Sequence, residues 1–304
     1  MLNILVITIC FAVLLWSSDL FVKQSLALAK KLKISGFLIG FTLVSIGTAL
    51  PDITISLYST IVDKTDIAIS TFLGSALVNV TLLLGVLAFF SKYKLLKVDI
   101  QKNIPVTLAG ITVLTFLVLI SKYQLHWWAG ILLLTTFVIG IIIVNKHNEQ
   151  VLPETKTKFN IFILLISLVL VMTMGKLLTD SITTLATNYN IETSILGFFL
   201  IGIVITIPEL TTSIIAIKRG GLELSLGNIL GSSLVNILLV PGIASLIRPI
   251  NFTNFIGELI FLFIAILFFQ IFALLGKKYY ISKQEGIVLL LLYVIFILLK
   301  GIGI

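Results

Sequence analysis

Long apolar stretches separated by short polar ones run through the whole chain, and they predict membrane-spanning helices. Each apolar stretch covers roughly 17–26 residues, enough for a helix to cross about 30 Å of hydrocarbon with some tilt. The pattern therefore predicts an all-α integral membrane protein with about ten transmembrane helices. The expected spans are residues 3–21, 36–61, 67–91, 104–121, 126–145, 159–179, 193–217, 223–247, 254–275 and 281–300.

The chain contains a related sequence twice, at a separation of 157 residues. Residues 40–52 read GFTLVSIGTALPD and residues 197–209 read GFFLIGIVITIPE. Shifted by 157 residues, each of the first five spans overlaps one of the last five, and an odd number of helices inverts the second copy in the membrane. We therefore expect two inverted five-helix repeats. They are a first repeat at 1–145 with its matching segment at 40–85, a linker at 146–158, and a second repeat at 159–304 with its matching segment at 197–242.

The composition narrows the class of protein further. Of 304 residues, 59% are hydrophobic and 11% are charged, and the mean hydropathy is +1.20, as expected of a polytopic membrane protein. The net charge of +8 does not indicate nucleic-acid binding, because the basic residues lie in connections between apolar spans. The single cysteine, Cys10, excludes an intrachain disulfide and a cysteine-rich metal site. The sequence has no phosphate-binding loop, so we expect no ATPase domain in this chain, no enzyme activity and no cofactor.

The distribution of basic residues predicts the orientation in the membrane. Connections on one side hold 16 of the 21 lysines and arginines. By the positive-inside rule this side is cytoplasmic, which places the 146–158 linker inside and both termini outside. We expect a multi-pass, monomeric protein of the plasma membrane, with the lipid bilayer and inorganic cations as its partners. The five basic residues on the other side are Lys64, Lys122, Lys176, Arg248 and Lys300.

Each repeat places an acid directly after a proline inside an apolar span. Pro51 removes a backbone N–H and frees carbonyl groups near Thr48 and Ala49, and Asp52 follows. The next span offers Ser75 and Asn79, one helical turn apart. Carboxylate, amide, hydroxyl and carbonyl oxygens suit hard cations such as Ca²⁺ and Na⁺.

The second repeat supplies a corresponding set, in which Glu209 takes the place of Asp52. We expect the two half-sites to meet near the bilayer midplane with a summed charge of −2, which one Ca²⁺, two Na⁺ or two protons would neutralise. Asp19 differs, because its repeat mate is Lys176; anchoring or helix packing is the favoured interpretation there. The candidate ion-binding residues are Thr48, Ala49, Asp52, Ser75 and Asn79 in the first repeat and Ile205, Thr206, Glu209, Ser232 and Asn236 in the second.

These motifs resemble those of the cation/calcium exchanger superfamily, on its Na⁺/Ca²⁺ exchanger side. Residues 47–52 (GTALPD) and 227–232 (GNILGS) are similar to the two family motifs, while 204–209 and 70–75 match them less fully. The resemblance implies a ten-helix antiporter in which the two motif acids bind Ca²⁺ and the hydroxyl and amide residues bind Na⁺. The departures from the family pattern are the shorter acid Asp52, Ala49 without a hydroxyl, Ile205 in place of threonine, and Asn236 where many members have aspartate.

Three functions compete at this point. The leading hypothesis is a secondary antiporter that exchanges Ca²⁺ for Na⁺, and the hydroxyls of Thr48, Thr206, Ser75 and Ser232 favour Na⁺. The second is a Ca²⁺/H⁺ or other cation/H⁺ antiporter, because a buried carboxylate can cycle through protonation. The third is a cation channel or a non-transporting membrane scaffold, which the inverted repeat disfavours.

The orientation can be tested by labelling intact cells with an impermeant thiol reagent. A cysteine introduced as Gln150→Cys, in the linker, should stay unlabelled, whereas Lys122→Cys should react. The opposite labelling pattern would reverse the assignment of the two sides and leave the inverted repeat unaffected.

Overall fold

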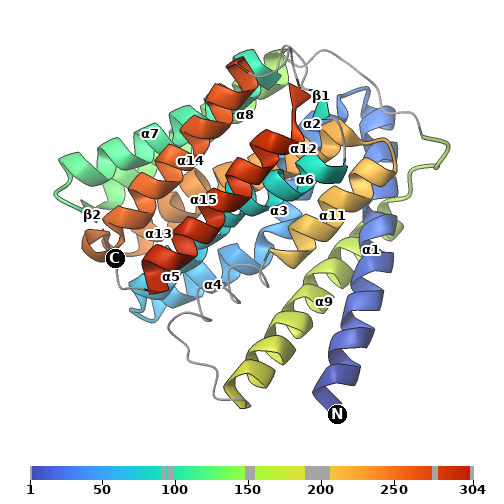
Figure 1. Cartoon of the computed structure of the whole chain (residues 1–304), viewed down its shortest axis with the longest axis horizontal. Helices are drawn as coiled ribbons and strands as arrows, with labels where there is room; N and C mark the ends of the chain where they lie inside the picture. The colour runs from blue at the N-terminus through green and yellow to red at the C-terminus, as the bar shows by residue number, and fades with distance from the viewer. Residues whose placement is uncertain are drawn as a thin grey trace. The chain divides into compact units, whose positions relative to one another are not determined.

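The computed structural model describes residues 2–90, 93–94, 99–147, 155–188, 206–275 and 280–301, and these are almost entirely helical (Figure 1). The α-helices are α1 (Leu2–Leu32), α2 (Gly36–Ile39), α3 (Ser45–Thr48), α4 (Leu50–Ile61), α5 (Thr65–Val78), α6 (Leu84–Phe90), α7 (Ile104–Ile120), α8 (Trp127–His147), α9 (Ile161–Asn188), α11 (Ile207–Lys218), α12 (Leu222–Leu234), α13 (Val240–Ile247), α14 (Ile256–Leu275) and α15 (Lys283–Gly301). Short π-helical segments are η1 (Gly40–Val44), η2 (Asn79–Leu83), η3 (Asp99–Asn103) and η4 (Val235–Leu239), and η5 (Thr253–Phe255) is a 3₁₀ turn. The strands are β1 (Tyr93–Lys94), β2 (Gln124–Leu125), β3 (Ile250–Asn251) and β4 (Tyr280–Ile281).

The described helices confirm a membrane protein with many spans but do not establish the number ten. Seven helices are long and apolar enough to cross a membrane, and a bent pair at Gly36–Thr48 and Leu50–Ile61 raises the number to eight. The seventh expected span, 193–217, lies largely outside the described residues, which resume at Thr206. The tenth, 281–300, corresponds to α15, which is helical but is not among the seven. The division into five-plus-five helices stays a prediction.

The chain forms two compact units, which are described separately. The first unit comprises residues 1–51, 149–229 and 297–303. Within it, α1 and α9 lie side by side (Figure 1). Apolar side chains that are completely or almost completely buried fill the space between their facing sides, as expected of helices that pack along their length. These core residues include Leu14, Phe21, Leu164, Val171 and Leu178.

Two glycines in this unit bring helix backbones into direct contact. A Cβ atom on Gly40 would overlap the carbonyl oxygen of Leu224 and come within 3.0 Å of the Asn228 backbone nitrogen. A Cβ atom on Gly227 would overlap the carbonyl oxygen of Phe37 and lie 2.8 Å from the Phe41 nitrogen. The first turns of the 36–48 segment and of α12 therefore cross at a distance that only glycine permits, as small residues allow in membrane helix pairs.

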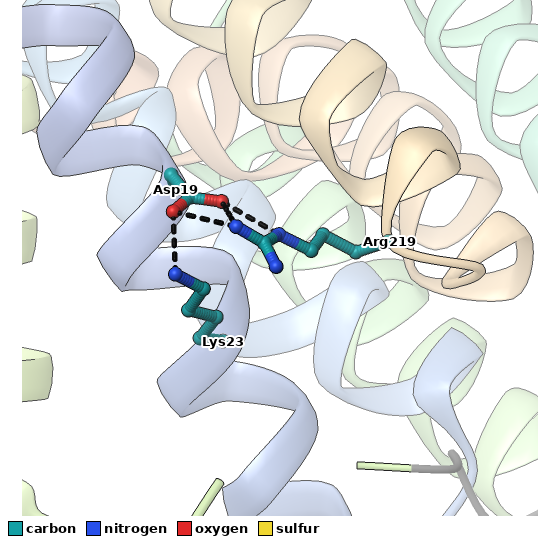
Figure 2. Close-up of polar contacts among 3 residues, drawn as sticks. All are labelled: Asp19, Lys23 and Arg219. Carbon is teal, nitrogen blue, oxygen red and sulfur yellow. Dashed lines mark hydrogen bonds and ion pairs between the residues drawn. The ribbon is translucent and has the colours of Figure 1, made fainter. Parts of the chain in front are cut away.

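An ion-paired cluster ties α1 to the end of α11 in the same unit (Figure 2). The Arg219 guanidinium donates from Nε and Nη2 to the two Asp19 carboxylate oxygens, at 2.7 and 2.9 Å. Lys23, one turn along α1, lies 2.7 Å from the same carboxylate. The bidentate geometry fixes the orientation as well as the charge balance. Asp19 thus has a helix-packing contact of the kind that the sequence analysis favoured for it.

The second unit comprises residues 52–148, 230–296 and 304. Here α14 lies beside α7 (Figure 1), and Phe72 of α5 packs against Phe252 with ring centroids 6.1 Å apart. Two short antiparallel strand pairs, β1 with β4 and β2 with β3, connect loops that are distant in sequence.

The 157-residue offset reappears in the backbone of this second unit. It carries β1 (93–94) onto β3 (250–251), and it carries β2 onto β4 to within one residue. It also carries the π-helical segment η2 onto η4 to within one residue. Related sequences thus adopt the same irregular local structure, although π-helical turns are rare in proteins.

The close helix crossing generates a prediction about stability. We expect Gly40→Ala to lower the free energy of unfolding by about 1–3 kcal/mol, because the added methyl group meets backbone that cannot rotate away. Gly257→Ala on α14 is the matched control, since nothing lies within 4 Å of its added Cβ. Thermal unfolding of the two purified variants in detergent measures the difference. Equal melting temperatures would contradict the close crossing.

Candidate functional site: buried oxygen groups at two helix breaks

The helix that carries the first acid is broken between Thr48 and Leu50. The segments on either side of the break are bent by 50°, and Ala49 between them has φ −80° and ψ 0°. Pro51 lies in the first turn of α4, where its missing N–H costs no hydrogen bond. Asp52 follows in the same turn, near unsatisfied backbone N–H groups and the positive end of the helix dipole. The sequence therefore places a carboxylate where a helix end stabilises its charge.

The second repeat forms the same turn. Thr206, the repeat mate of Ala49, has φ −88° and ψ 5°, and α11 begins at the next residue. Pro208 and Glu209 occupy its first turn, as Pro51 and Asp52 do in α4. Ile205, also predicted as a site residue, lies outside the described residues.

The predicted residues that the structure describes fall into two sets, one in each compact unit. Every member of both sets has at most 1% of its surface exposed, so these polar side chains are buried in an apolar protein. The first unit holds Thr48, Ala49, Thr206 and Glu209, and the second holds Asp52, Ser75, Asn79, Ser232 and Asn236.

In the second unit, the set is built around the Asp52 carboxylate. Asn236 donates from Nδ2 to Asp52 Oδ2 at 3.1 Å, and the Ser75 hydroxyl is a further hydrogen-bonding neighbour of the carboxyl group. Asp52 Oδ1, Asn236 Oδ1 and both polar atoms of the Asn79 side chain have no hydrogen-bond partner among the described residues. Buried polar atoms are nearly always satisfied, so these four atoms need a partner that protein groups do not provide. Three of the four atoms are oxygens of the kind that binds Na⁺ and Ca²⁺, namely Asp52 Oδ1, Asn79 Oδ1 and Asn236 Oδ1.

In the first unit, Asn228 connects members of the set by hydrogen bonds, although the sequence analysis did not include it. Asn228, completely buried on α12, accepts a hydrogen bond from the Thr48 hydroxyl at 3.2 Å. Its amide nitrogen donates to Ser213 Oγ at 3.0 Å and to the Glu209 backbone carbonyl at 3.4 Å. The sequence signal was present in the GNILGS motif at 227–232, but the asparagine was assigned no role.

The sequence analysis also missed a buried acid besides Asp52 and Glu209. Glu258 is 2% exposed on α14, within the span predicted at 254–275. An acid inside an apolar span was the available signal, since such residues are rare in hydrocarbon. It has no proline before it and no acid at its repeat mate, Gln101, so it lacks the pattern shared by Asp52 and Glu209.

The described residues contain no group of three or more histidine, cysteine, aspartate or glutamate side chains that could hold a metal ion. Each of the two sets combines one carboxylate with neutral oxygens, which are hydroxyl, amide and carbonyl groups. Such ligands suit Na⁺ and weakly held Ca²⁺, which a transporter must release, better than a transition metal.

A helix broken in front of a buried acid, with a second buried acid in the proline-containing first turn of α11, is typical of a membrane cation transporter of the secondary type. A family model described as "Sodium/calcium exchanger protein" matches residues 2–145 and 159–301, and the chain belongs to this family. This confirms the resemblance noted in the sequence. Family membership favours a Ca²⁺/Na⁺ antiporter over the proton-coupled alternative and over a channel or scaffold.

Individual relatives agree over nearly the whole chain. The putative antiporter CaxA of Alkalimonas amylolytica is 28% identical over 298 residues, which cover 92% of this chain and 93% of the relative. The sodium/calcium exchanger MaX1 of Methanosarcina acetivorans is 27% identical over 349 residues, with 97% of each chain covered. A solved structure of the sodium-calcium exchanger NCX_Mj, soaked with Na⁺ and Ca²⁺, matches with a TM-score of 0.83, 30% identity and 98% of each chain covered.

Proposed function

We propose that this protein exchanges Ca²⁺ for Na⁺ across the membrane by alternating access, and that Asp52 and Glu209 carry the charge that both loads neutralise. One observation carries the proposal above the others. Each acid is buried and lies in the first turn of a helix, directly after a proline, at positions related by the repeat, and the first of them follows a helix break. Inverted-repeat transporters place their coupling ions at such discontinuous helices.

The exchange follows from charge balance. Two ionised carboxylates in hydrocarbon are costly when they are uncompensated, so a translocating state needs a compensating load. One Ca²⁺ or two Na⁺ supplies the same two positive charges. Either load therefore lets the protein change between its outward-facing and inward-facing states, whereas the unloaded protein does not readily do so. This mutual exclusion makes the protein an exchanger and prevents a leak.

The two sets of oxygen groups suggest how the ligands are divided. Asp52, with Ser75, Asn79, Ser232 and Asn236 from the same unit, supplies carboxylate, hydroxyl and amide oxygens. Glu209 is accompanied by Thr48 and Thr206, and Ala49 contributes through its carbonyl oxygen. Ile205 would likewise act only through its carbonyl oxygen. These assignments are proposals that rest on burial, on hydrogen bonding and on the repeat.

Asn236 supports a site with two acids. Its amide donates a hydrogen bond to Asp52 Oδ2, which an ionised aspartate in its place could not do. The donor stabilises the ionised form of Asp52 and keeps the summed charge at −2.

We also propose the finer features of location that the basic residues favour. These are insertion in the plasma membrane with both termini outside, and function as a monomer. The segments between spans support the orientation through their excess of lysine and arginine on one side.

Neutralising either acid tests the proposed function. We expect Asp52→Asn and Glu209→Gln each to reduce Na⁺-driven uptake of radioactive Ca²⁺ into proteoliposomes on the order of a hundredfold or more, since leaving a buried charge unpaired costs about 3–5 kcal/mol. Asp66→Asn is the control, because Asp66 is also an acid in the first turn of a helix but is exposed to solvent.

The control variant should transport at the rate of the unchanged protein. Undiminished Ca²⁺ flux in either buried-acid variant would contradict the proposed site. Uptake driven by a pH gradient in the absence of Na⁺ would instead move the protein to the proton-coupled class.

The dependence on membrane potential tests the stoichiometry. We expect three Na⁺ per Ca²⁺, one more than the two that neutralise the acids, because neutral hydroxyl, amide and carbonyl oxygens around a charge of −2 can bear one extra positive charge. One net charge then crosses per cycle, and about 100 mV is worth about 2.3 kcal/mol, or roughly fiftyfold in the final Ca²⁺ ratio.

The measurement uses proteoliposomes loaded with Na⁺, with the potential set by K⁺ and valinomycin. An inside-positive potential should increase Ca²⁺ accumulation, since Na⁺ efflux then carries the excess charge out. Accumulation that is indifferent to the potential would indicate exchange of two Na⁺ for one Ca²⁺.

A further inference from the structure

The carboxamide of Asn228 has no freedom to flip. Its nitrogen faces the backbone carbonyl oxygen of Glu209 at 3.4 Å, and a carbonyl can only accept a hydrogen bond. The same nitrogen is 3.0 Å from Ser213 Oγ, which can accept the second amide proton. With the nitrogen committed to these two acceptors, Oδ1 is the atom that faces Thr48. The side chain is completely buried, so water does not compete for either end.

The fixed amide in turn determines the direction of the Thr48 hydroxyl. A threonine hydroxyl has one proton and two lone pairs, and here the proton points to Asn228 Oδ1 at 3.2 Å. The alternative acceptor is the Ser45 carbonyl one turn back, at the longer distance of 3.4 Å. When the proton is held by Asn228, the lone pairs point away from it and can face a cation. A proton directed at the cation would repel it.

The other copy of the repeat lacks both members of this pair. The mate of Thr48 at the 157-residue offset is Ile205, which has no hydroxyl, and the mate of Asn228 is Thr71. Thr71 donates its proton to the carbonyl of Ile67 on its own helix, at 2.8 Å. Within this chain, asparagine thus accompanies the threonine that has a hydroxyl to orient, whereas the corresponding positions of the other copy are isoleucine and threonine.

We infer that Asn228 is a residue that positions the Thr48 hydroxyl for Na⁺, and that the corresponding positions of the other copy lack this device. The inference rests on the proposed Na⁺/Ca²⁺ exchange. Asn228 is not proposed as an ion ligand. Its amide nitrogen donates hydrogen bonds to the Glu209 carbonyl and Ser213 Oγ, and its oxygen accepts one from the Thr48 hydroxyl. The first-repeat hydroxyl is therefore the oriented one, and the corresponding residue of the second repeat, Ile205, has no hydroxyl to orient.

The test is a double-mutant cycle read as the Na⁺ concentration that gives half-maximal Ca²⁺ exchange in proteoliposomes. Asn228→Thr, which copies the other repeat, should raise this concentration about fivefold, the effect of one lost hydrogen bond. The maximal rate should change less than twofold. In a Thr48→Val background, where no hydroxyl remains to be oriented, Asn228→Thr should produce no further increase.

A purely structural role for Asn228 predicts a different result. Loss of Asn228 would then lower the melting temperature and the maximal rate. The half-maximal Na⁺ concentration would either stay unchanged, or rise about 25-fold in the double variant because the effects of Asn228→Thr and Thr48→Val would be independent. Either result overturns the inference. Thr48→Ser provides a further check, because it keeps the hydroxyl, so Asn228→Thr should again raise the half-maximal Na⁺ concentration about fivefold in this background.

Ser213→Ala serves if Asn228→Thr does not fold, since it removes only one acceptor of the amide. It should raise the half-maximal Na⁺ concentration about twofold alone and not at all with Thr48→Val. Equal shifts in both backgrounds would count against the inference. Failure of the unchanged protein to exchange Ca²⁺ for Na⁺ would be a failure of the proposed function, and it is distinguished by that first measurement.

Discussion

Buried charge at a broken helix is the constraint on which the rest of this molecule depends. In hydrocarbon, every freed backbone group and every ionised side chain must find a partner, because water is not available. Asp52 and Glu209 stand where a helix begins, so unsatisfied N–H groups and the helix dipole stabilise part of each charge. What remains is compensated by neighbouring amides and hydroxyls and, in the proposed cycle, by the transported cations. A transporter needs this incomplete compensation, since a fully satisfied site would have no use for an ion.

The packing around these groups is correspondingly close. Gly40 and Gly227 let two backbones touch in the first unit, and this close crossing supports the helix that carries Asn228. The Asp19–Arg219 ion pair holds the end of α11 to α1 in the same unit. In the second unit, π-helical turns start at or just before Asn79 and Asn236. A widened turn displaces side chains from the regular helical register, and such turns are frequent at functional sites.

At the positions where both copies are described, the turns before the two acids have the same local backbone but different side chains. Ala49 and Thr206 have nearly identical backbone angles, although one has a hydroxyl and the other does not. The acid is aspartate in one copy and glutamate in the other, and the oriented threonine is present once. An internal duplication constrains the chain path through its glycines and prolines, whereas individual ligands can change as long as the summed charge and the number of oxygens suffice. Selectivity between Na⁺ and Ca²⁺ can therefore be set unequally by the two halves.

The sequence by itself determined the class of protein, because hydrocarbon thickness fixes the length of apolar spans and duplication leaves a readable offset. It also predicted Asp52 and Glu209 as buried ion-binding acids, since helix packing alone rarely places an acid beside a proline within an apolar span. The structure shows that both acids are buried, and their ion binding stays a proposal. Three things came only from the tertiary structure. Asn228 lies 180 residues from Thr48, and no local pattern shows that their side chains meet. Asp19 pairs with Arg219, 200 residues away in the sequence, as well as with Lys23 on its own helix. In the sequence, Asn236 was interpreted as the loss of a negative charge, whereas in the structure its amide donates a hydrogen bond to Asp52. Hydrophobic periodicity records which residues avoid water, but the pairing of polar groups inside the protein depends on how helices distant in sequence cross, and only the folded chain decides that.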